Sequence, residues 1–415
     1  MRNKKISILL IIIAATILVS CSTKVSNEEK VIDTVVIDEN AKETAKANDS
    51  FNVVKVKTTE NLSNEDKYSE TLMDNGKLIR IKYDLGDNQN EGTINQPQFP
   101  KLYIEGIDVG TITDETDNNR NKISWDKKDI EGQLITGYMG GYNVKILKDN
   151  KVYMFDNNSE LKEIKAYERL IEEKNGDLNR FDSSYDGNLD IHYFDKGSGV
   201  NKIVVIDPIN DKYYEIKGDI LNDFTNKKLN ILSVENEKIY VSIVDSMSEA
   251  DSIVGYIENN KLYTFFEIES AIEVKAGMDV IYSNNNILFS GYVEGDYGLW
   301  RYDIDKKELY KEANLKYTNN SSTINKDKNF IVISSYDNYG KQHISLARVK
   351  QNLEISNIQD ITDIIVATTD NNLNWRFLRD WVDSNKLYVE CADYEMINNE
   401  RTLVDSYYQV YELKN

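Results

Sequence analysis

Histidine, cysteine and proline are scarce in this chain: its 415 residues include two histidines, two cysteines and three prolines. With so few histidines and cysteines to bind a metal, and with no HExxH or CxxC pattern, a zinc site is not expected. The sequence also lacks a G-x-S-x-G nucleophile elbow and a phosphate-binding loop. His192 and His343 lie in a strand-like run and after a polar turn, where structural roles are expected. No residue is therefore assigned a catalytic role.

Positive charge is also in deficit. The chain has 50 basic and 70 acidic residues, which gives a formal net charge of −20 at pH 7. A chain this acidic is repelled by polyphosphate and by anionic lipid headgroups. Nucleic acid is therefore excluded as a partner, and the folded body is expected to stand off from a membrane surface.

The longest apolar run, Ile6 to Val19, follows three basic residues among the first five. It is too short for a transmembrane helix of about 20 residues, and the small Ser20 follows it, which is typical of a secretory signal. The motif Leu18-Val19-Ser20-Cys21 resembles a bacterial lipobox. The resemblance implies a lipoprotein whose signal peptide, 1–20, is removed and whose Cys21 thiol carries a diacylglyceryl group. Its acyl chains would hold the protein at the cell membrane, facing the extracytoplasmic side. An uncleaved N-terminal anchor is the alternative.

A lipidated Cys21 would leave Cys391 without a partner for an intramolecular disulfide. An exported chain without disulfides depends on its apolar core, and 40% hydrophobic residues over this length allow a large one. Cys391 follows a strand-like run and has no basic cluster beside it in sequence, so a buried and unreactive thiol is expected.

Two further segments follow the signal peptide. Residues 21–50 begin with Cys21, are mostly polar and contain no aromatic residue, which predicts a disordered tether. Residues 51–415 form the predicted folded domain. There, short runs of Ile, Val, Leu, Tyr and Phe alternate with turns rich in Asn, Asp, Gly and Lys. The stretch from Ala166 to Lys174 is the best candidate for a helix, with a strand end as the alternative.

One local phrase recurs in the folded domain: a polar turn, then Lys, an aliphatic residue and Tyr. It occurs as Asn150-Lys151-Val152-Tyr153, Glu237-Lys238-Ile239-Tyr240, Asn260-Lys261-Leu262-Tyr263 and Asn385-Lys386-Leu387-Tyr388. Each copy predicts a tight turn that leads into a strand with one buried face. Strands are expected to begin near residues 191, 238, 287, 330 and 386, each followed by another strand.

A four-strand unit repeated about every 40 to 50 residues is typical of a β-propeller. The texture of 51–415 resembles the exported bacterial propellers of the TolB-like class, although no WD, kelch or Asp-box motif names a subfamily. The resemblance implies an all-β fold of about seven four-stranded blades, with six or eight blades, or a sandwich followed by a smaller propeller, as alternatives. The run from Tyr407 to Leu413 is expected to join a blade, beside a strand from 51–57 that closes the ring.

One loop has spacing similar to short calcium-binding loops. Residues 182–190 read D-x-S-x-D-G-x-x-D, with oxygen ligands at alternating positions and a glycine for the turn. The candidate calcium ligands are Asp182, Ser184, Asp186, Asp190 and the carbonyl of Asn188. A polar loop around an Asp-Gly turn, with no cofactor, is the alternative.

A second candidate site consists of Trp375, Phe377, Arg379 and Trp381. At the two-residue period of a strand, these side chains would share one face. An aromatic and arginine cluster suits contact with a protein or a glycan. Apolar core between blades, with Arg379 at its rim, is the other interpretation.

The sequence thus predicts a lipid-anchored β-propeller that is not an enzyme and serves as a binding or assembly platform. Its partner would be a protein or a cell-wall ligand. The alternative is a polysaccharide-active enzyme that uses carboxylates in the propeller channel. A fold alone does not decide between the two.

Overall fold

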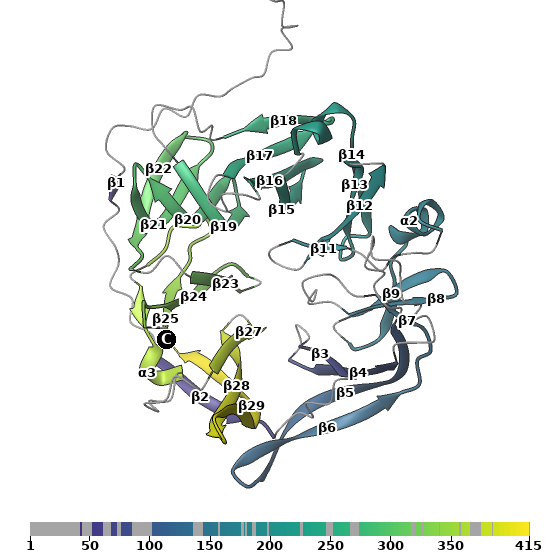
Figure 1. Cartoon of the computed structure of the whole chain (residues 1–415), viewed down its shortest axis with the longest axis vertical. Coiled ribbons are helices and arrows are strands. Elements are labelled where there is room, and N and C mark those ends of the chain that lie inside the picture. The colour runs from purple at the N-terminus through teal and green to yellow at the C-terminus, as the bar shows by residue number, and fades with distance from the viewer. Residues whose placement is uncertain are drawn as a thin grey trace, which may run out of the picture. The chain divides into compact units, whose positions relative to one another are not determined.

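The computed structural model is built almost entirely of β-strands (Figure 1). It describes residues 42–43, 52–60, 68–72, 76–84, 102–135, 144–156, 158–175, 178, 181–184, 188–196, 199–224, 227–245, 252–265, 274–316, 320–325, 327–339, 341–356, 358–365, 375–383 and 385–414. The all-β prediction is confirmed. Contacts divide the chain into Met1–Asp33 and Thr34–Asn415, and every described residue belongs to the second unit.

The strands follow one another with short connections. They are β1 (Lys42–Glu43), β2 (Asn52–Thr58), β3 (Tyr68–Leu72), β4 (Leu78–Asp84), β5 (Leu102–Asp117), β6 (Arg120–Lys128), β7 (Gln133–Ile135), β8 (Lys145–Lys148), β9 (Lys151–Phe155), β10 (Leu161–Glu163), β11 (Asp182–Ser183), β12 (Asp190–Lys196), β13 (Gly199–Asp207), β14 (Lys212–Lys217), β15 (Lys227–Glu235), β16 (Lys238–Asp245), β17 (Ser252–Glu258), β18 (Lys261–Thr264), β19 (Val274–Ser283), β20 (Asn286–Val293), β21 (Asp296–Asp303), β22 (Glu308–Asn314), β23 (Asn320–Ile324), β24 (Phe330–Tyr336), β25 (Gln342–Arg348), β26 (Gln359–Asp360), β27 (Trp375–Asp383), β28 (Lys386–Ile397) and β29 (Glu400–Lys414).

The described helices are short. They are α2 (Tyr167–Glu173), α3 (Thr362–Ile365) and the 3-10 helix η1 (Asp219–Phe224). Helix α2 confirms the candidate helix between Ala166 and Lys174. None of the helices in the described part of the chain is long and apolar enough to cross a membrane.

Tight two-residue turns connect many of these strands. At Asn118-Asn119, Asn259-Asn260 and Asn398-Asn399, both turn residues have positive φ, between 48° and 68°. Such turns match the right-handed twist of a hairpin, and asparagine adopts this backbone conformation more readily than most residues. The strands expected near 191, 238, 287, 330 and 386 are confirmed as β12, β16, β20, β24 and β28.

The strands pair into antiparallel groups of four. Sheets β11–β14, β15–β18 and β23–β26 each contain four consecutive strands, and β19–β22 also carries β1 in parallel on β22. The eight-stranded sheet consists of two such groups, β3–β6 and β7–β10, joined where Leu102 and Tyr103 pair with Leu134 and Gln133. The remaining sheet has the order β2-β29-β28-β27.

The two ends of the folded region meet in that last sheet. Strand β2 pairs antiparallel with β29, from Asn52 opposite Lys414 to Thr58 opposite Gln409. The expected pairing of the C-terminal run with a strand from 51–57 is therefore confirmed. Within the predicted tether 21–50, the described residues Lys42–Glu43 form β1 on β22, which differs from the disorder expected there. Cys21 and the predicted signal peptide lie outside the described residues.

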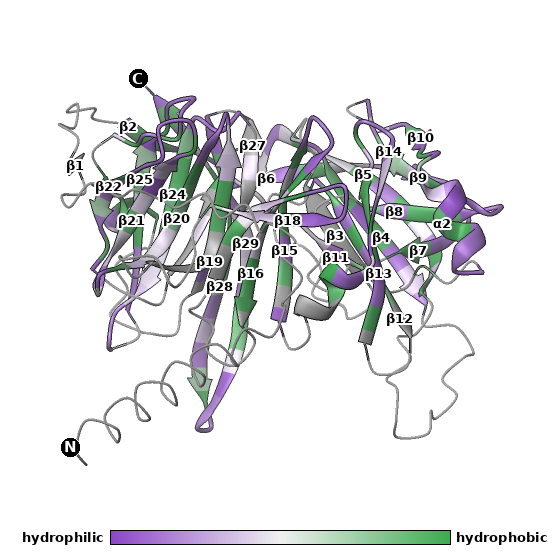
Figure 2. Cartoon of the chain, turned by 90° about the horizontal axis from the view of Figure 1, so that it is seen from above, coloured by the Kyte–Doolittle hydropathy of each residue, from purple (hydrophilic) through white to green (hydrophobic). Residues whose placement is uncertain are grey.

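Seven apolar clusters fill the spaces between consecutive four-stranded groups. The cluster around Ile81 and Ile146 joins β3–β6 to β7–β10, and further clusters join each later group to the next. A last cluster, with Leu78 and Ile123 against Tyr388 and Val410, joins the final sheet to β3–β6. Figure 2 shows the hydrophobic residues concentrated along the strands and the hydrophilic ones at the turns. Each group thus buries both faces against neighbours, and the contacts return to their starting point.

We expect the pairing of β2 with β29 to contribute a large share of the stability. Val53 on β2 is 7% exposed and packs in the core, whereas Val56 on the same strand is 39% exposed. Val53→Asp should lower the free energy of unfolding by at least about 3 kcal/mol, because it buries an unpaired carboxylate. Val56→Asp should cost less than about 1 kcal/mol. Urea unfolding followed by circular dichroism measures both, and equal losses would contradict the packing described here.

Candidate functional site

The predicted calcium loop is only partly described, and its visible residues have other partners. The Ser184 hydroxyl accepts a hydrogen bond from the backbone N–H of Leu189 at 2.9 Å, and Asp190 is fully buried. Asp186 lies outside the described residues. No group of three or more His, Cys, Asp or Glu side chains within the described ranges is arranged to hold a metal ion. The calcium site, with Asp182 and Asp190 at the ends of the loop and the Asn188 carbonyl among its ligands, stays a prediction.

Asp190 belongs instead to a buried polar cluster between two strand groups. Its Oδ1 lies 2.8 Å from Lys145 Nζ on β8, and its Oδ2 accepts a hydrogen bond from the Tyr167 hydroxyl on α2 at 2.7 Å. The Tyr167 oxygen also lies 3.3 Å from His192 Nε2 on β12. All four side chains are fully buried. The cluster therefore fastens α2 and β8 to the sheet that contains β12.

The surroundings of this cluster fit a structural role. Burial raises the pKa of the Asp190 carboxyl, although the Lys145 ammonium opposes that rise. Burial and the Asp190 carboxylate together raise the pKa of the Tyr167 hydroxyl. The His192 ring packs against Phe181 at 5.1 Å between centroids. Side chains with no exposed surface cannot meet a substrate from solvent, so we assign these residues to the core.

Of the aromatic and arginine cluster, the structure describes the side chain of Trp381, and the shared face of the four residues stays a prediction. Strand β27 carries a bulge between Leu378 and Asp380, which places Arg379 opposite no residue of β28. The bulge changes the alternation, so Trp375 and Phe377 pair with Ala392 and Glu390, whereas Trp381 pairs with Leu387. Trp381 is buried and stacks on Phe330 at 5.9 Å, which confirms the core interpretation for that residue.

Exposed apolar side chains gather instead on the hairpin of β28 and β29. The two strands pair as far as Ile397 opposite Glu400, well past Trp375 of β27 and Thr58 of β2 (Figure 2). We call residues 393–405 the hairpin arm. Large apolar residues on it are exposed: Met396 (56%), Ile397 (44%), Leu403 (38%) and Val404 (46%). Such residues usually face a core, so their exposure marks this arm as a candidate contact surface.

Ion pairs at the base of the hairpin arm hold it in place. Two guanidinium nitrogens of Arg120, at the start of β6, donate to the two carboxylate oxygens of Asp405. On strand β28, Asp393 accepts a hydrogen bond of 2.8 Å from the guanidinium of Arg376, which lies on β27. Arg120 also lies over the ring of Tyr407, 4.4 Å from its centroid. These paired hydrogen bonds tie the base of the arm to β6 and β27.

Cys391 lies just below the arm and is fully buried, as expected. Burial raises the pKa of its thiol to about 12, with the nearby Arg376 acting in the opposite direction. A thiol with this pKa is almost entirely protonated near neutral pH, so it is a poor nucleophile.

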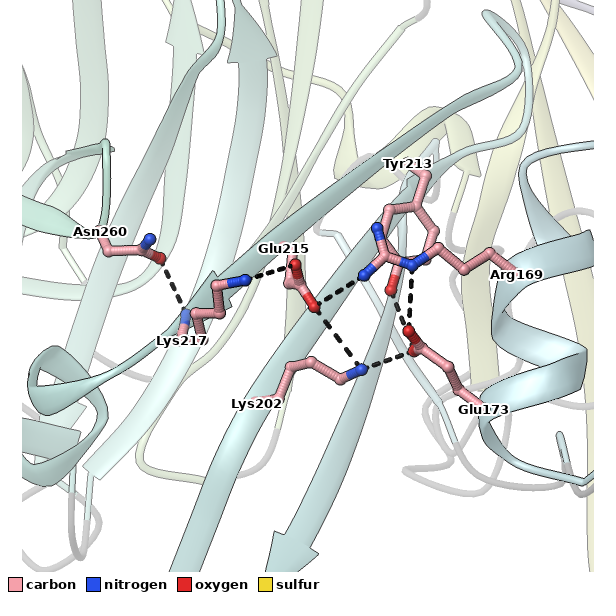
Figure 3. A network of polar contacts seen from close by, with 7 residues as sticks. All are labelled: Arg169, Glu173, Lys202, Tyr213, Glu215, Lys217 and Asn260. Carbon is pink, nitrogen blue, oxygen red and sulfur yellow. Dashed lines mark hydrogen bonds and ion pairs between the residues drawn. The ribbon is translucent and has the colours of Figure 1, made fainter.

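A surface network ties α2 to the sheet beside it (Figure 3). It comprises Arg169, Glu173, Lys202, Tyr213, Glu215, Lys217 and Asn260. Glu173 and Glu215 each form ion pairs with two or more basic side chains. Partial burial opposes ionisation of the two carboxyl groups, but hydrogen bonds from the basic side chains outweigh it and lower both pKa values. The Lys217 N–H donates to Asn260 Oδ1 at 2.9 Å, which reaches the neighbouring sheet. Exposed ion pairs of this kind individually contribute little to the free energy of unfolding. We therefore infer that the network orients α2 against the neighbouring sheet.

Comparisons with known proteins give a weak structural likeness and no family. No protein-family model matches the chain, and no curated protein matches its sequence. Among solved structures the chain is similar to TolB from Acinetobacter baumannii, with a TM-score of 0.31 and 8% identity. That match covers 60% of this chain and 58% of the other. A likeness of this extent carries no conclusion about function.

A substitution of Lys145 tests whether the buried cluster is structural. Lys145→Met should lower the free energy of unfolding by about 3–5 kcal/mol, because it leaves the Asp190 carboxylate buried and unpaired. The double variant Lys145→Met with Asp190→Asn should recover most of that loss, since no buried charge then lacks a partner. Urea unfolding compares the three proteins. If the double variant is as unstable as the single one, the ion pair is not the source of the loss.

The Arg120 pair at the base of the arm predicts a pH-dependent contribution. Arg120→Met should cost about 1 kcal/mol at pH 7, whereas Lys57→Met, which removes an ion pair with the exposed Asp114, should cost almost nothing. The hydrogen bonds from Arg120 lower the pKa of Asp405. The stabilisation is therefore fully present above about pH 4, the usual pKa of an aspartate, and is lost as the pH falls from there through the lower pKa of Asp405 in the folded protein. Unfolding curves at pH 7 and pH 3 check this, and an undiminished difference at pH 3 would refute it.

Proposed function

We propose that this protein is a lipid-anchored, extracytoplasmic β-propeller that binds a protein or cell-envelope ligand without catalysing a reaction. Cys21 is the proposed attachment point, and residues 22–50 are the proposed spacer between the membrane and the folded domain. The lipobox-like motif and the basic, apolar N-terminus support the anchor.

The pairing of the strands supports the propeller. The described strands fall into seven antiparallel groups of four, counting β2 with β27–β29, and each group packs on the next. The final group packs on the group β3–β6, and strand β2 completes the final group. Radial repetition of four-stranded sheets, with short protected edges, is the principle of a propeller.

The observation that carries the binding function is the hairpin arm. It projects past the strands beside it, exposes four large apolar side chains and is fixed at its base by Arg120 and Arg376. An exposed apolar surface on a rigid support suits binding, because little conformational entropy is lost when a partner docks.

Photo-crosslinking in the cell of origin tests this function. A benzophenone amino acid at Met396 in the anchored protein should yield a discrete crosslinked species after irradiation, because the arm is then in contact with its partner. The same probe at Ile209, which is 44% exposed on the β13–β14 turn, is the matched control and should yield none. Absence of any adduct from position 396, or equal adducts from both positions, would contradict the proposed function.

A further inference from the structure

The hairpin arm has two faces of different chemistry. Tyr394 pairs with Leu403, and Met396 pairs with Arg401, so these four residues share one face. Arg401 lies over the Tyr394 ring, 4.1 Å from its centroid, which leaves the apolar side chains of Met396 and Leu403 uncovered. We call this the apolar face of the arm.

The opposite face carries two acidic residues together with the exposed Ile397. Glu395 pairs with Thr402, and Ile397 pairs with Glu400, which places both glutamates on this second face. Both are exposed, and neither forms an ion pair with any residue in the described ranges. The acids at the base differ, because Asp393 and Asp405 are neutralised by Arg376 and Arg120. The tip therefore carries acids that are available to a partner.

One edge of the arm pairs with none of the described strands. Strand β2 follows β29 only as far as Thr58 opposite Gln409, after which Thr59 bonds to the backbone of Tyr408. From there the chain turns to β6, where the Glu60 N–H donates to the carbonyl of Asn121. Along residues 400–405, the outer edge of β29 pairs with no other described strand. A free edge of this kind can accept an added strand.

We propose that the outer edge of β29 in the hairpin arm takes up an extended segment of a partner protein in which apolar and basic residues alternate. This inference deepens the proposed function and rests on it. Added as a third strand, such a segment would place its apolar side chains beside Leu403, on the face that Met396 shares. Its basic side chains would fall on the other face, beside Glu400, because strand side chains alternate.

Charge selects this occupant over the alternatives. A second copy of the chain would bring its own acidic tip and a formal net charge of −20 to the contact. An anionic lipid surface is repelled by the same carboxylates. A basic and apolar strand instead pairs opposite charges across the new edge, and cross-strand pairs of that kind stabilise a sheet.

Synthetic peptides test the inference with the full-length protein in detergent. The probe is a fluorescent peptide of about seven alternating lysine and leucine residues, and binding is measured by anisotropy at physiological salt. Three analogues replace the lysines by glutamate, replace the leucines by serine, or N-methylate alternate backbone nitrogens. We expect each analogue to bind at least about tenfold more weakly, since each removes one element of the proposed contact.

Matched variants of the protein locate the site. Glu400→Lys and Leu403→Ser should each weaken binding of the lysine-leucine peptide by about fivefold or more. Glu131→Lys and Ile209→Ser make the same changes at exposed positions outside the arm and should leave it unchanged.

Several outcomes would overturn the inference. If the serine analogue binds as tightly as the lysine-leucine peptide, the contact is non-specific charge attraction. If the N-methylated analogue binds as tightly as that peptide, strand addition is excluded. Concentration-dependent dimerisation that Leu403→Ser abolishes would show a second copy as the occupant. Each of these results leaves the platform function standing, because crosslinking from position 396 tests that function separately.

Discussion

The structure depends on the pairing of β2 with β29, which joins the first strand of the folded domain to the last. Without β2, the final sheet would lose its fourth strand and the buried contacts of Val53. The pairing also directs the chain from Thr59 to β6, and so to the base of the hairpin arm. A chain whose buried Cys391 has no described disulfide partner obtains its cohesion from such long-range contacts. The same pairing therefore completes the core and supports the exposed surface.

The position of the hairpin arm follows from a mismatch in strand length. Strands β28 and β29 have 12 and 15 residues, whereas their neighbours β27 and β2 have 9 and 7. The excess must project, and a projecting ribbon of two strands is only marginally stable alone. Arg120 forms an ion pair with Asp405, and Arg376 forms one with Asp393, near the points where β2 and β27 end. The two ion pairs thus lie where the hairpin of β28 and β29 leaves its neighbouring strands, and the exposed apolar residues lie beyond them.

Sequence reasoning succeeded where the signal is local. Asn-Asn and Asp-Asn turns followed by Lys, an aliphatic residue and Tyr located the strands, because turn geometry depends on two adjacent residues. It failed where the outcome depends on distant residues. The partner of Asp190 is Lys145, 45 residues away, and the bulge between Leu378 and Asp380 has no glycine to indicate it in the sequence. The arm had a readable sign, the Asn398-Asn399 turn between two long alternating runs.

The polar contacts between sheets address a problem that repetition creates. Strand groups of similar sequence and shape could pack on the wrong neighbour, since apolar faces are poorly selective. The junctions differ in their polar contacts: Lys145 with Asp190, Lys217 with Asn260, Glu312 with the Ile355 N–H, and Gln342 with the Arg376 carbonyl. A mispaired junction at Lys145 would leave the buried Asp190 carboxylate without its partner, at a cost of several kcal/mol, whereas the exposed contact of Lys217 with Asn260 adds little. Apolar burial therefore drives the sheets together, while the buried pair of Lys145 and Asp190 favours the correct neighbour at its junction.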